Sequence, residues 1–244
     1  MYNGNVGKKR KIDALDIIPK PELLAMIHSI NSSTKVRDKA LVAFVYLTGA
    51  RISEILGTIK CSSKYKKSDI SKGTPYKIRE PLKREEYKVE PLKKESVEVN
   101  FEDDIIRVYN VICLKRKFEN IRRTIPIIIS QERPFVDIFL KYYNTLEDGQ
   151  PLFKINRQRA WQIMNKNMVK KIDGKEVRLF NHFMIHERCS HLAAQKNFNP
   201  LDLQKFRGWR NTSQASVYAH LNTEDLANKM RGSKSESQAI KRKD

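Results

Sequence analysis

Several features that would indicate other protein classes are missing from this sequence of 244 residues. No apolar run approaches the roughly 20 residues that a membrane-spanning helix needs, so we expect no membrane partner. The N-terminus, Met1-Tyr-Asn-Gly-Asn-Val-Gly-Lys-Lys-Arg-Lys11, lacks the apolar segment of a secretory signal. The patterns GxxxxGK[ST], GxGxxG and HExxH are also missing, which leaves nucleotide hydrolysis and zinc chemistry without support.

Cysteine is scarce and widely spaced. Cys61, Cys113 and Cys189 are odd in number and form no CxxC pair. We therefore expect neither a disulfide framework nor a zinc knuckle, and we expect a reducing, cytoplasmic compartment.

Charge of one sign dominates what is present. The chain has 48 Lys and Arg against 28 Asp and Glu, a formal net charge of +20. An excess of this size repels itself and is usually retained because the partner is polyanionic. Nucleic acid is the first candidate partner and an anionic membrane surface is the second.

The spacing of apolar residues predicts a mainly helical chain. Helical periodicity is found early in the chain, around a break at Asn31-Ser-Ser-Thr34, and again from Pro134 onward. The predicted helices are 20–31, 36–48, 52–56, 134–145, 156–170, 181–196, 200–208, 212–220 and 223–231, with a turn at Asp173-Gly174 between two of them.

A short β-rich region interrupts the helices. Residues 104–114 and 121–129 are rich in β-branched side chains and flank a turn near Asn120, which predicts an antiparallel hairpin. Pro126 predicts that the second strand lies at a sheet edge. The expected fold class is therefore α+β: a helical body with a small antiparallel sheet.

Composition divides the chain into parts. We expect a basic N-terminal arm at 1–18, a main domain at 19–231 and a basic tail at 232–244. Residues 58–97, rich in Lys, Ser, Pro and Glu, read as an exposed insertion with one or two short strands. The alternative interpretation is a basic flap that lies along DNA.

Three clusters hold groups that suit phosphate. In Leu47-Thr-Gly-Ala-Arg-Ile-Ser-Glu54, Arg51 stands where a helix begins, a place that favours anions, although an ion pair with Glu54 is the simpler interpretation. In His182-Phe-Met-Ile-His-Glu-Arg-Cys-Ser-His191, no cysteine or carboxylate stands at ligand spacing, so we expect no metal. The third, Phe206-Arg-Gly-Trp-Arg-Asn-Thr-Ser-Gln-Ala-Ser-Val-Tyr-Ala-His-Leu221, has Tyr218 near its end with a small residue after it. This suggests access from solvent, although a core or rim position is the simpler interpretation.

Taken in order, these clusters resemble the tyrosine recombinases, the phage-integrase, Xer and Cre group. The resemblance covers roughly residues 20–231. Its most specific parts are Thr48-Gly-Ala-Arg-Ile-Ser-Glu54 and the interval from Trp209 to Tyr218. The final motifs are similar to those of archaeal and archaeal-virus integrases, so the host is expected to be archaeal or a virus of archaea.

The resemblance implies a role for each matched residue. Arg51 would bind a non-bridging oxygen of the scissile phosphate, and Trp209 would donate its indole N–H to the same phosphate. Tyr218 would attack phosphorus to give a 3′-phosphotyrosine and a free 5′-hydroxyl. His182 would open the HxxR motif. A hairpin lysine, Lys117 or Lys115, would protonate the leaving 5′-oxygen. Because the phosphotyrosine conserves bond energy, no cofactor is expected.

One position departs from the family pattern. The second arginine of the HxxR motif is replaced by Ile185, which cannot donate to phosphate. Losing such a donor costs on the order of 10²–10³ in rate. The chain is then a degenerate recombinase that binds DNA without cutting it, a deliberately inactivated variant, or an enzyme in which Arg188 or a nearby basic residue reaches the phosphate instead.

The sequence therefore favours a site-specific DNA recombinase that acts on double-stranded DNA as a dimer or tetramer at a synapse. The resemblance implies that the helix at 223–231 packs on a neighbouring protomer. A catalytically silent DNA-binding protein and a type IB topoisomerase are the alternatives. Only the basic arm precedes the catalytic-type domain, so the arm and the 58–97 insertion either replace the N-terminal DNA clamp of full integrases, or that clamp is missing from this chain.

Overall fold

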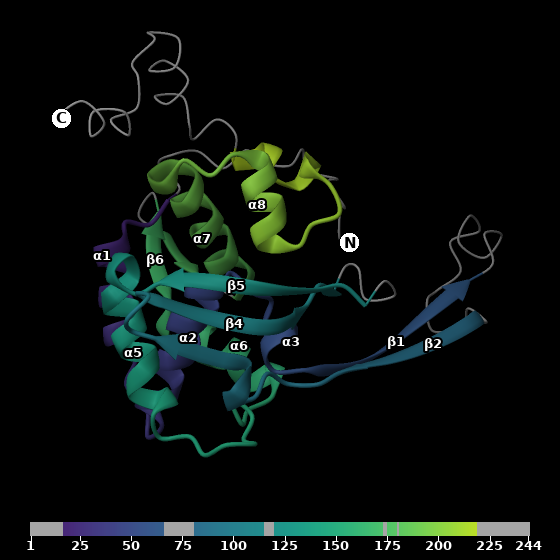
Figure 1. Cartoon of the computed structure of the whole chain (residues 1–244), viewed down its shortest axis with the longest axis horizontal. Coiled ribbons are helices and arrows are strands. Elements are labelled where there is room, and N and C mark those ends of the chain that lie inside the picture. Colours follow the sequence, from purple (N-terminus) through teal and green to yellow (C-terminus); the bar gives the residue numbers. More distant parts are fainter. Residues whose placement is uncertain (1–16, 66–80, 115–119, 173–174, 180, 219–244) are drawn as a thin grey trace, which may run out of the picture.

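A computed structural model describes residues 17–65, 81–114, 120–172, 175–179 and 181–218 (Figure 1). Most of the predicted arm, the 223–231 helix, the tail and both hairpin lysines, Lys115 and Lys117, lie outside these described residues. Within the ranges given, no helix is long and apolar enough to cross a membrane.

Helices dominate the described fold, as predicted. They are α1 (Lys20–His28), α2 (Lys35–Thr48), α3 (Ile52–Ile55), α5 (Arg133–Tyr143), α6 (Arg157–Asn167), α7 (Asn181–Lys196) and α8 (Pro200–Arg207), with short 3-10 turns at Lys94–Ser96, Ser130–Glu132 and Thr212–Gln214.

Helix α2 is the centre of the main core. Every residue from Ala40 to Thr48 is buried, because α1, α5, α6 and α7 pack around the helix. Phe44 stacks on Phe139 of α5 with ring centroids 4.7 Å apart. A helix that is apolar all round is expected in such a position. The chain leaves α2 at Gly49, and the candidate residues near Arg51 follow directly.

The sheet that faces this core has the order β3-β4-β5. Its strands are β3 (Val97–Asn100), β4 (Ile105–Ile112) and β5 (Arg122–Ile128), all antiparallel. The predicted hairpin is β4–β5, and Pro126 does lie on an edge strand. Strand β3 was not predicted. The architecture is thus the expected α+β arrangement.

Two further strand pairs lie outside this sheet. Strands β1 (Thr58–Tyr65) and β2 (Pro81–Val89) pair antiparallel and extend away from the helical body as a ribbon (Figure 1). Strands β6 (Val169–Ile172) and β7 (Lys175–Arg178) form a second ribbon between α6 and α7.

The β6–β7 ribbon corrects the predicted helix 156–170, which extends too far, whereas the predicted turn at residues 173–174 lies outside the described residues. Helix α6 ends at Asn167, and the chain that follows becomes strand because it pairs with a partner further along the sequence. The predicted helix 212–220 is also wrong in its described part, where the chain forms a 3-10 turn at Thr212–Gln214.

The start of the described chain is anchored to α7. The sequence places Ile18 in the basic arm, but the structure buries it completely. Its backbone N–H donates to Glu187 over 2.9 Å, and its carbonyl oxygen lies 2.9 Å from Nε2 of His191. His191 is therefore a buried structural histidine.

A smaller apolar cluster lies where α7, α8 and the segment after α8 meet. Its buried members are Cys189, Leu192, Ala193, Leu203, Trp209, Ala215 and Tyr218. Two predicted site residues, Trp209 and Tyr218, are thus held by this cluster rather than by the main core.

Candidate active site

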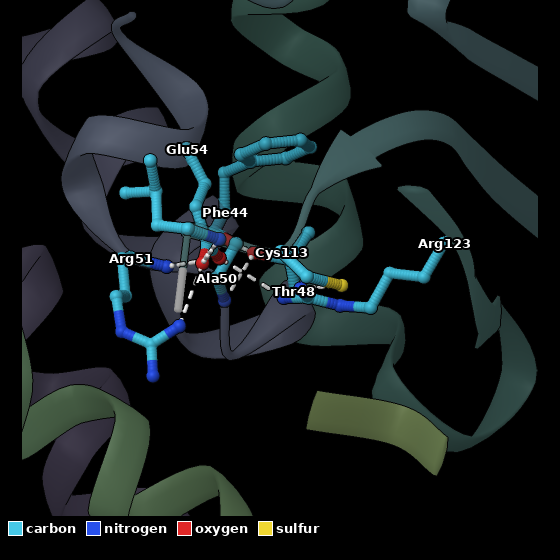
Figure 2. Close-up of polar contacts among 8 residues, drawn as sticks. Phe44, Thr48, Ala50, Arg51, Glu54, Cys113 and Arg123 are labelled. Carbon is cyan, nitrogen blue, oxygen red and sulfur yellow. Dashed lines mark hydrogen bonds and ion pairs between the residues drawn. The ribbon is translucent and has the colours of Figure 1, made fainter. Parts of the chain in front are cut away.

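The turn after α2 positions Arg51. Gly49 ends the helix in the left-handed region, with φ of 55°. The hydroxyl of Thr48 donates to the carbonyl of Phe44 over 2.6 Å and accepts from the backbone N–H of Ala50 over 3.2 Å. These contacts reverse the chain sharply, so that Arg51 caps α3 (Figure 2).

Glu54 joins Arg51 to the sheet. Its Oε1 lies 2.7 Å from Nη1 of Arg51, and its Oε2 lies 3.1 Å from Nη2 of Arg123 on β5 (Figure 2). The Glu54 side chain is fully buried. Burial raises the pKa of this carboxyl, but Arg123, Arg51 and Arg207 outweigh it and hold that pKa below the usual value. The ion pair that the sequence offered for Arg51 therefore forms, and it includes a second arginine.

Arg123 is a site residue that the sequence analysis missed. It lies on β5 with Ile125 and Ile127, which are buried at alternate positions of the same strand. A charged residue that continues an inward-facing alternation was the available signal. Its Nη1 also lies 3.5 Å from the sulfur of Cys113.

Helix α7 presents the histidines and Ile185. His182 is exposed, His186 is half-buried, and the two rings pack edge to face with centroids 4.6 Å apart. Ile185 is 3% exposed and contributes only apolar surface. Burial, together with the neighbouring His182 and Arg207, lowers the pKa of His186 to about 4, so His186 is neutral at neutral pH.

Arg188 does not replace the missing arginine. Its Nη1 lies 2.6 Å from Oε1 of Glu132, and its guanidinium lies over the ring of Tyr46 at 5.3 Å. Glu132 also pairs with Lys20 at 2.9 Å. Arg188 therefore ties α7 to the helical body, and the hypothesis that Arg188 reaches the phosphate is not supported.

Tyr218 and Trp209 pack against each other. Their rings are nearly parallel, with centroids 6.4 Å apart and an interplanar angle of 10°. The Tyr218 hydroxyl lies 2.5 Å from Nδ1 of His186. Only 2% of Tyr218 is exposed, so in this arrangement the simpler interpretation, a core position, holds and Tyr218 is not reachable from solvent. Burial raises the pKa of Tyr218, so its hydroxyl is protonated.

Arg207, the last residue of α8, is the second site residue that sequence analysis missed. It is 1% exposed, and its guanidinium lies 5.7 Å from the centre of the Trp209 ring. Burial, with the charges of Arg123 and Arg51, lowers the pKa of Arg207 to about 10, which leaves it positively charged at neutral pH. It follows the buried Leu203 by four positions, a helical spacing that indicates an inward-facing side chain.

Gly208 brings α8 against the hairpin. Its φ is 62°, and a Cβ at this position would lie 2.2 Å from the sulfur of Cys113 and 3.3 Å from Arg123. Only glycine fits so close to β4 and β5. The structure thus brings together Arg51, His182, Trp209 and Tyr218, with Arg123, His186 and Arg207 added. Among the described residues, no cluster of His, Cys, Asp or Glu could hold a metal ion.

This arrangement of helices, small sheet and clustered arginines matches known proteins. The profile of the phage integrase family matches residues 17–225, which is most of the chain. The chain therefore belongs to the phage integrase family. No curated protein matches the sequence.

Solved structures of recombinases share the fold. The XerH site-specific recombinase bound to difH substrate, in a pre-cleavage complex, is 13% identical with a TM-score of 0.51 over 86% of this chain. A post-cleavage XerH complex is 12% identical with a TM-score of 0.54 over 89%. The catalytic domain of bacteriophage HP1 integrase is 15% identical, with a TM-score of 0.49 over 89% of this chain and 94% of that domain. The matched region covers 52% of each XerH chain.

Proposed function

We propose that this chain is a site-specific DNA recombinase that cleaves and rejoins duplex DNA through a 3′-phosphotyrosine at Tyr218. The observation that carries the proposal is the pairing of Tyr218 with His186, beside Trp209 and the buried cation Arg207. Membership of the phage integrase family and the XerH fold support it. The XerH structures are complexes with difH substrate, which supports DNA as the partner here.

The reaction follows from these groups. The Tyr218 oxygen attacks phosphorus, the new oxygen–phosphorus bond forms, and the bond to the 5′-oxygen breaks. The phenol proton leaves along the hydrogen bond to Nδ1 of His186, which is neutral and can accept it. The 5′-oxygen takes a proton from Lys115 or Lys117, which lie outside the described residues. Attack by a 5′-hydroxyl reverses the steps and rejoins the strand.

The phosphate is held by cationic and neutral donors. Arg51 has a side chain that is 19% exposed, and its link to Glu54 fixes the guanidinium at the end of α2. Trp209 donates its indole N–H. Donors fixed in advance stabilise the charge that grows on the phosphate oxygens in the transition state. Because Tyr218 is buried, the segment that covers it must open before a DNA phosphate can reach its hydroxyl.

Assembly and host are part of the proposal. Recombination needs two or more protomers at a synapse, and the 223–231 helix is proposed to join them as a dimer or tetramer. The archaeal or archaeal-virus host, and a DNA-associated cytoplasmic location, stay predictions.

Nicked suicide duplexes tiled over the DNA that flanks the gene test this function. The released end cannot rejoin, so a covalent protein–DNA band accumulates on a denaturing gel. We expect a band from the native chain and none from Tyr218→Phe, which keeps the ring and removes only the nucleophile. A band that persists in Tyr218→Phe contradicts the assignment of the nucleophile.

A catalytically silent DNA-binding protein is the second candidate, favoured by Ile185. An apolar residue, 3% exposed, stands where the resemblance places a cationic donor. This candidate predicts equal DNA affinity for the native chain and Tyr218→Phe, and no covalent band from either. A band that appears only with Ile185→Arg indicates a recombinase scaffold silenced at this one position.

A further inference from the structure

Positive charges outnumber negative charges around Arg207. Three guanidinium groups, those of Arg51, Arg123 and Arg207, interact with one another and with a single carboxylate, Glu54. Glu54 already pairs with Arg51 at 2.7 Å and with Arg123 at 3.1 Å. Both of its oxygens are thus engaged, and Arg207 has no carboxylate of its own among the described residues. A buried charge without a partner is costly, so a missing anion is the natural explanation.

Arg207 also has unused hydrogen-bond donors. Its Nε and Nη1 are buried and have no hydrogen-bond partner within the described part of the chain. Arg123 and Arg188 also leave Nε without a partner, but each of them has a carboxylate partner. Arg188 reaches Glu132 at 2.6 Å, and Arg123 reaches Glu54. Arg207 is 1% exposed, so solvent offers little compensation.

The position of Arg207 links the two halves of the site. On one side it interacts electrostatically with Arg51, Arg123 and Glu54. On the other side, where burial raises the pKa of Tyr218 and lowers that of His186, its positive charge lowers both pKa values, and His186 is adjacent to Ile185 on α7. Its guanidinium lies over Trp209 at 5.7 Å. The one buried arginine without a carboxylate partner in the described chain therefore stands beside the nucleophile, on the helix that follows α7.

We propose that Arg207 is the phosphate-binding arginine that compensates for Ile185, with an unpaired N–H of its guanidinium donating to a non-bridging oxygen of the scissile phosphodiester. This inference rests on the proposed recombinase function. A guanidinium N–H forms a strong, charge-assisted hydrogen bond with a phosphate oxygen, so Arg207 can hold the group from α8 as an arginine on α7 would. The cationic donor then comes from α8 instead of α7, and the site keeps an arginine that binds the phosphate.

Inorganic phosphate tests the inference without any activity. Thermal unfolding of the full chain at low salt is measured with and without phosphate, for the native chain, Arg207→Leu and Arg210→Leu. Arg210 is exposed and three residues away, so its variant controls for loss of one positive charge. We expect phosphate to raise the Tm of the native chain and Arg210→Leu but not of Arg207→Leu. Equal shifts in all three overturn the inference.

The same experiment separates a binding role from a structural one. Without phosphate, Arg207→Leu removes a buried charge that lacks a carboxylate partner, so we expect a Tm equal to or above the native value. A purely structural arginine gives the opposite result, a lower Tm together with an unchanged response to phosphate, and that outcome overturns the inference.

The suicide duplex gives the catalytic test. We expect Arg207→Leu to form the covalent adduct about 10²–10³-fold more slowly, while Arg210→Leu stays close to native. Placing a neutral methylphosphonate at the cleavage position removes the charge that Arg207 neutralises, so the difference between the native chain and Arg207→Leu should shrink at least tenfold. Adding Ile185→Arg to Arg207→Leu should restore cleavage, since the cation returns by way of α7.

The outcomes distinguish this inference from the proposed function. If the native chain forms adduct and Arg207→Leu matches it, the recombinase function stands and the role of Arg207 is wrong. If only chains carrying Ile185→Arg form adduct, the scaffold is a recombinase and Arg207 does not compensate. If no chain forms adduct, the proposed function fails, and the phosphate titration alone decides whether Arg207 binds this anion.

Discussion

At the scale of single residues, the site depends on which basic side chains share a buried carboxylate. Arg51 and Arg123 come from different elements, α3 and β5, and both reach Glu54. Arg188 and Lys20 share Glu132 in the same way. Glu54 therefore joins the start of α3 to β5, and Glu132 joins α1 to α7.

Replacing Glu54 with Gln tests this shared pairing. The amide is similar in size but cannot neutralise the two arginines, so we expect a loss of about 3–5 kcal/mol in the free energy of unfolding, as for other broken buried pairs. Urea unfolding at pH 7 measures the change. Glu90→Gln is the control, because the Lys88–Glu90 pair is about two-thirds exposed on each side and should contribute little. A similar loss in both variants argues against the shared pairing.

A buried histidine makes stability depend on pH. Nδ1 of His191 lies 2.8 Å from the Tyr46 hydroxyl, and burial lowers the pKa of His191 to about 4 from the ordinary 6.5. Because the unfolded chain takes up the proton first, stability is complete above pH 6.5 and falls as pH drops toward 4. The shift corresponds to about 3 kcal/mol, as an upper bound.

Urea unfolding of His191→Gln between pH 7.5 and 4.5 checks this effect. The variant should be less stable at pH 7.5 but should lose less stability on acidification, since its side chain does not titrate. His186, whose pKa is also lowered to about 4, contributes to the slope that remains. A variant with the native slope shows that His191 is not the titrating group.

At the scale of elements, Gly208 controls how α8 meets the hairpin. Gly208→Ala combines two costs: φ of 62°, which disfavours a side chain, and a Cβ that lies 2.2 Å from the Cys113 sulfur. Gly149→Ala is the matched control, because its φ is 81° but no atom lies within 4 Å of the added Cβ. We expect about 1 kcal/mol of destabilisation in Gly149→Ala and clearly more in Gly208→Ala, measured by urea unfolding.

A double variant isolates the steric clash from the backbone strain. Cys113→Ala removes the sulfur, so Gly208→Ala should cost less in that background than in the native chain. Additive effects of the two substitutions would show that α8 does not press on β4 as the structure has it.

The longer helices and the β4–β5 hairpin can be predicted from the sequence, but the shorter strands cannot. Helices α5, α7 and α8 and the β4–β5 hairpin follow from the spacing and type of their apolar residues, and α2 follows from its long apolar run. Strand β3 and the β6–β7 ribbon do not, since they are short and depend on pairing with a partner strand. The order of motifs identifies Arg51, Trp209 and Tyr218, whereas Arg123 and Arg207 emerge only when β5 and α8 are placed against Glu54 and Trp209. Local spacing indicates that both arginines face inward, but only the neighbouring elements show which groups they contact.

At the scale of the whole molecule, the fold places some lysines near the candidate site and others at the far end of the helical body. The candidate site follows the C-terminal end of α2, and Lys35 begins the same helix at its other end. Helix α5 runs antiparallel to α2, since Tyr46 packs on Phe135 and Phe44 on Phe139, so Lys141 also lies toward the far end. The β1–β2 ribbon, which contains Lys60 and Lys64, extends from the body just after α3 (Figure 1).

A net charge of +20 should make DNA binding steeply dependent on salt. Each lysine or arginine that binds a phosphate releases counterions, so a protein that neutralises 6–10 phosphates loses about 10³–10⁵ in affinity between 50 and 200 mM salt. Fluorescence anisotropy with a labelled duplex at several KCl concentrations measures the slope. Changing Lys60 and Lys64 to Gln should make the slope shallower by about 0.9 for each phosphate that the ribbon no longer neutralises, if the ribbon follows the DNA. The matched pair Lys35→Gln and Lys141→Gln removes the same charge from the far end and should leave the slope unchanged. Equal effects from the two pairs would mean that the protein attracts DNA by net charge alone, without a binding face that includes the ribbon.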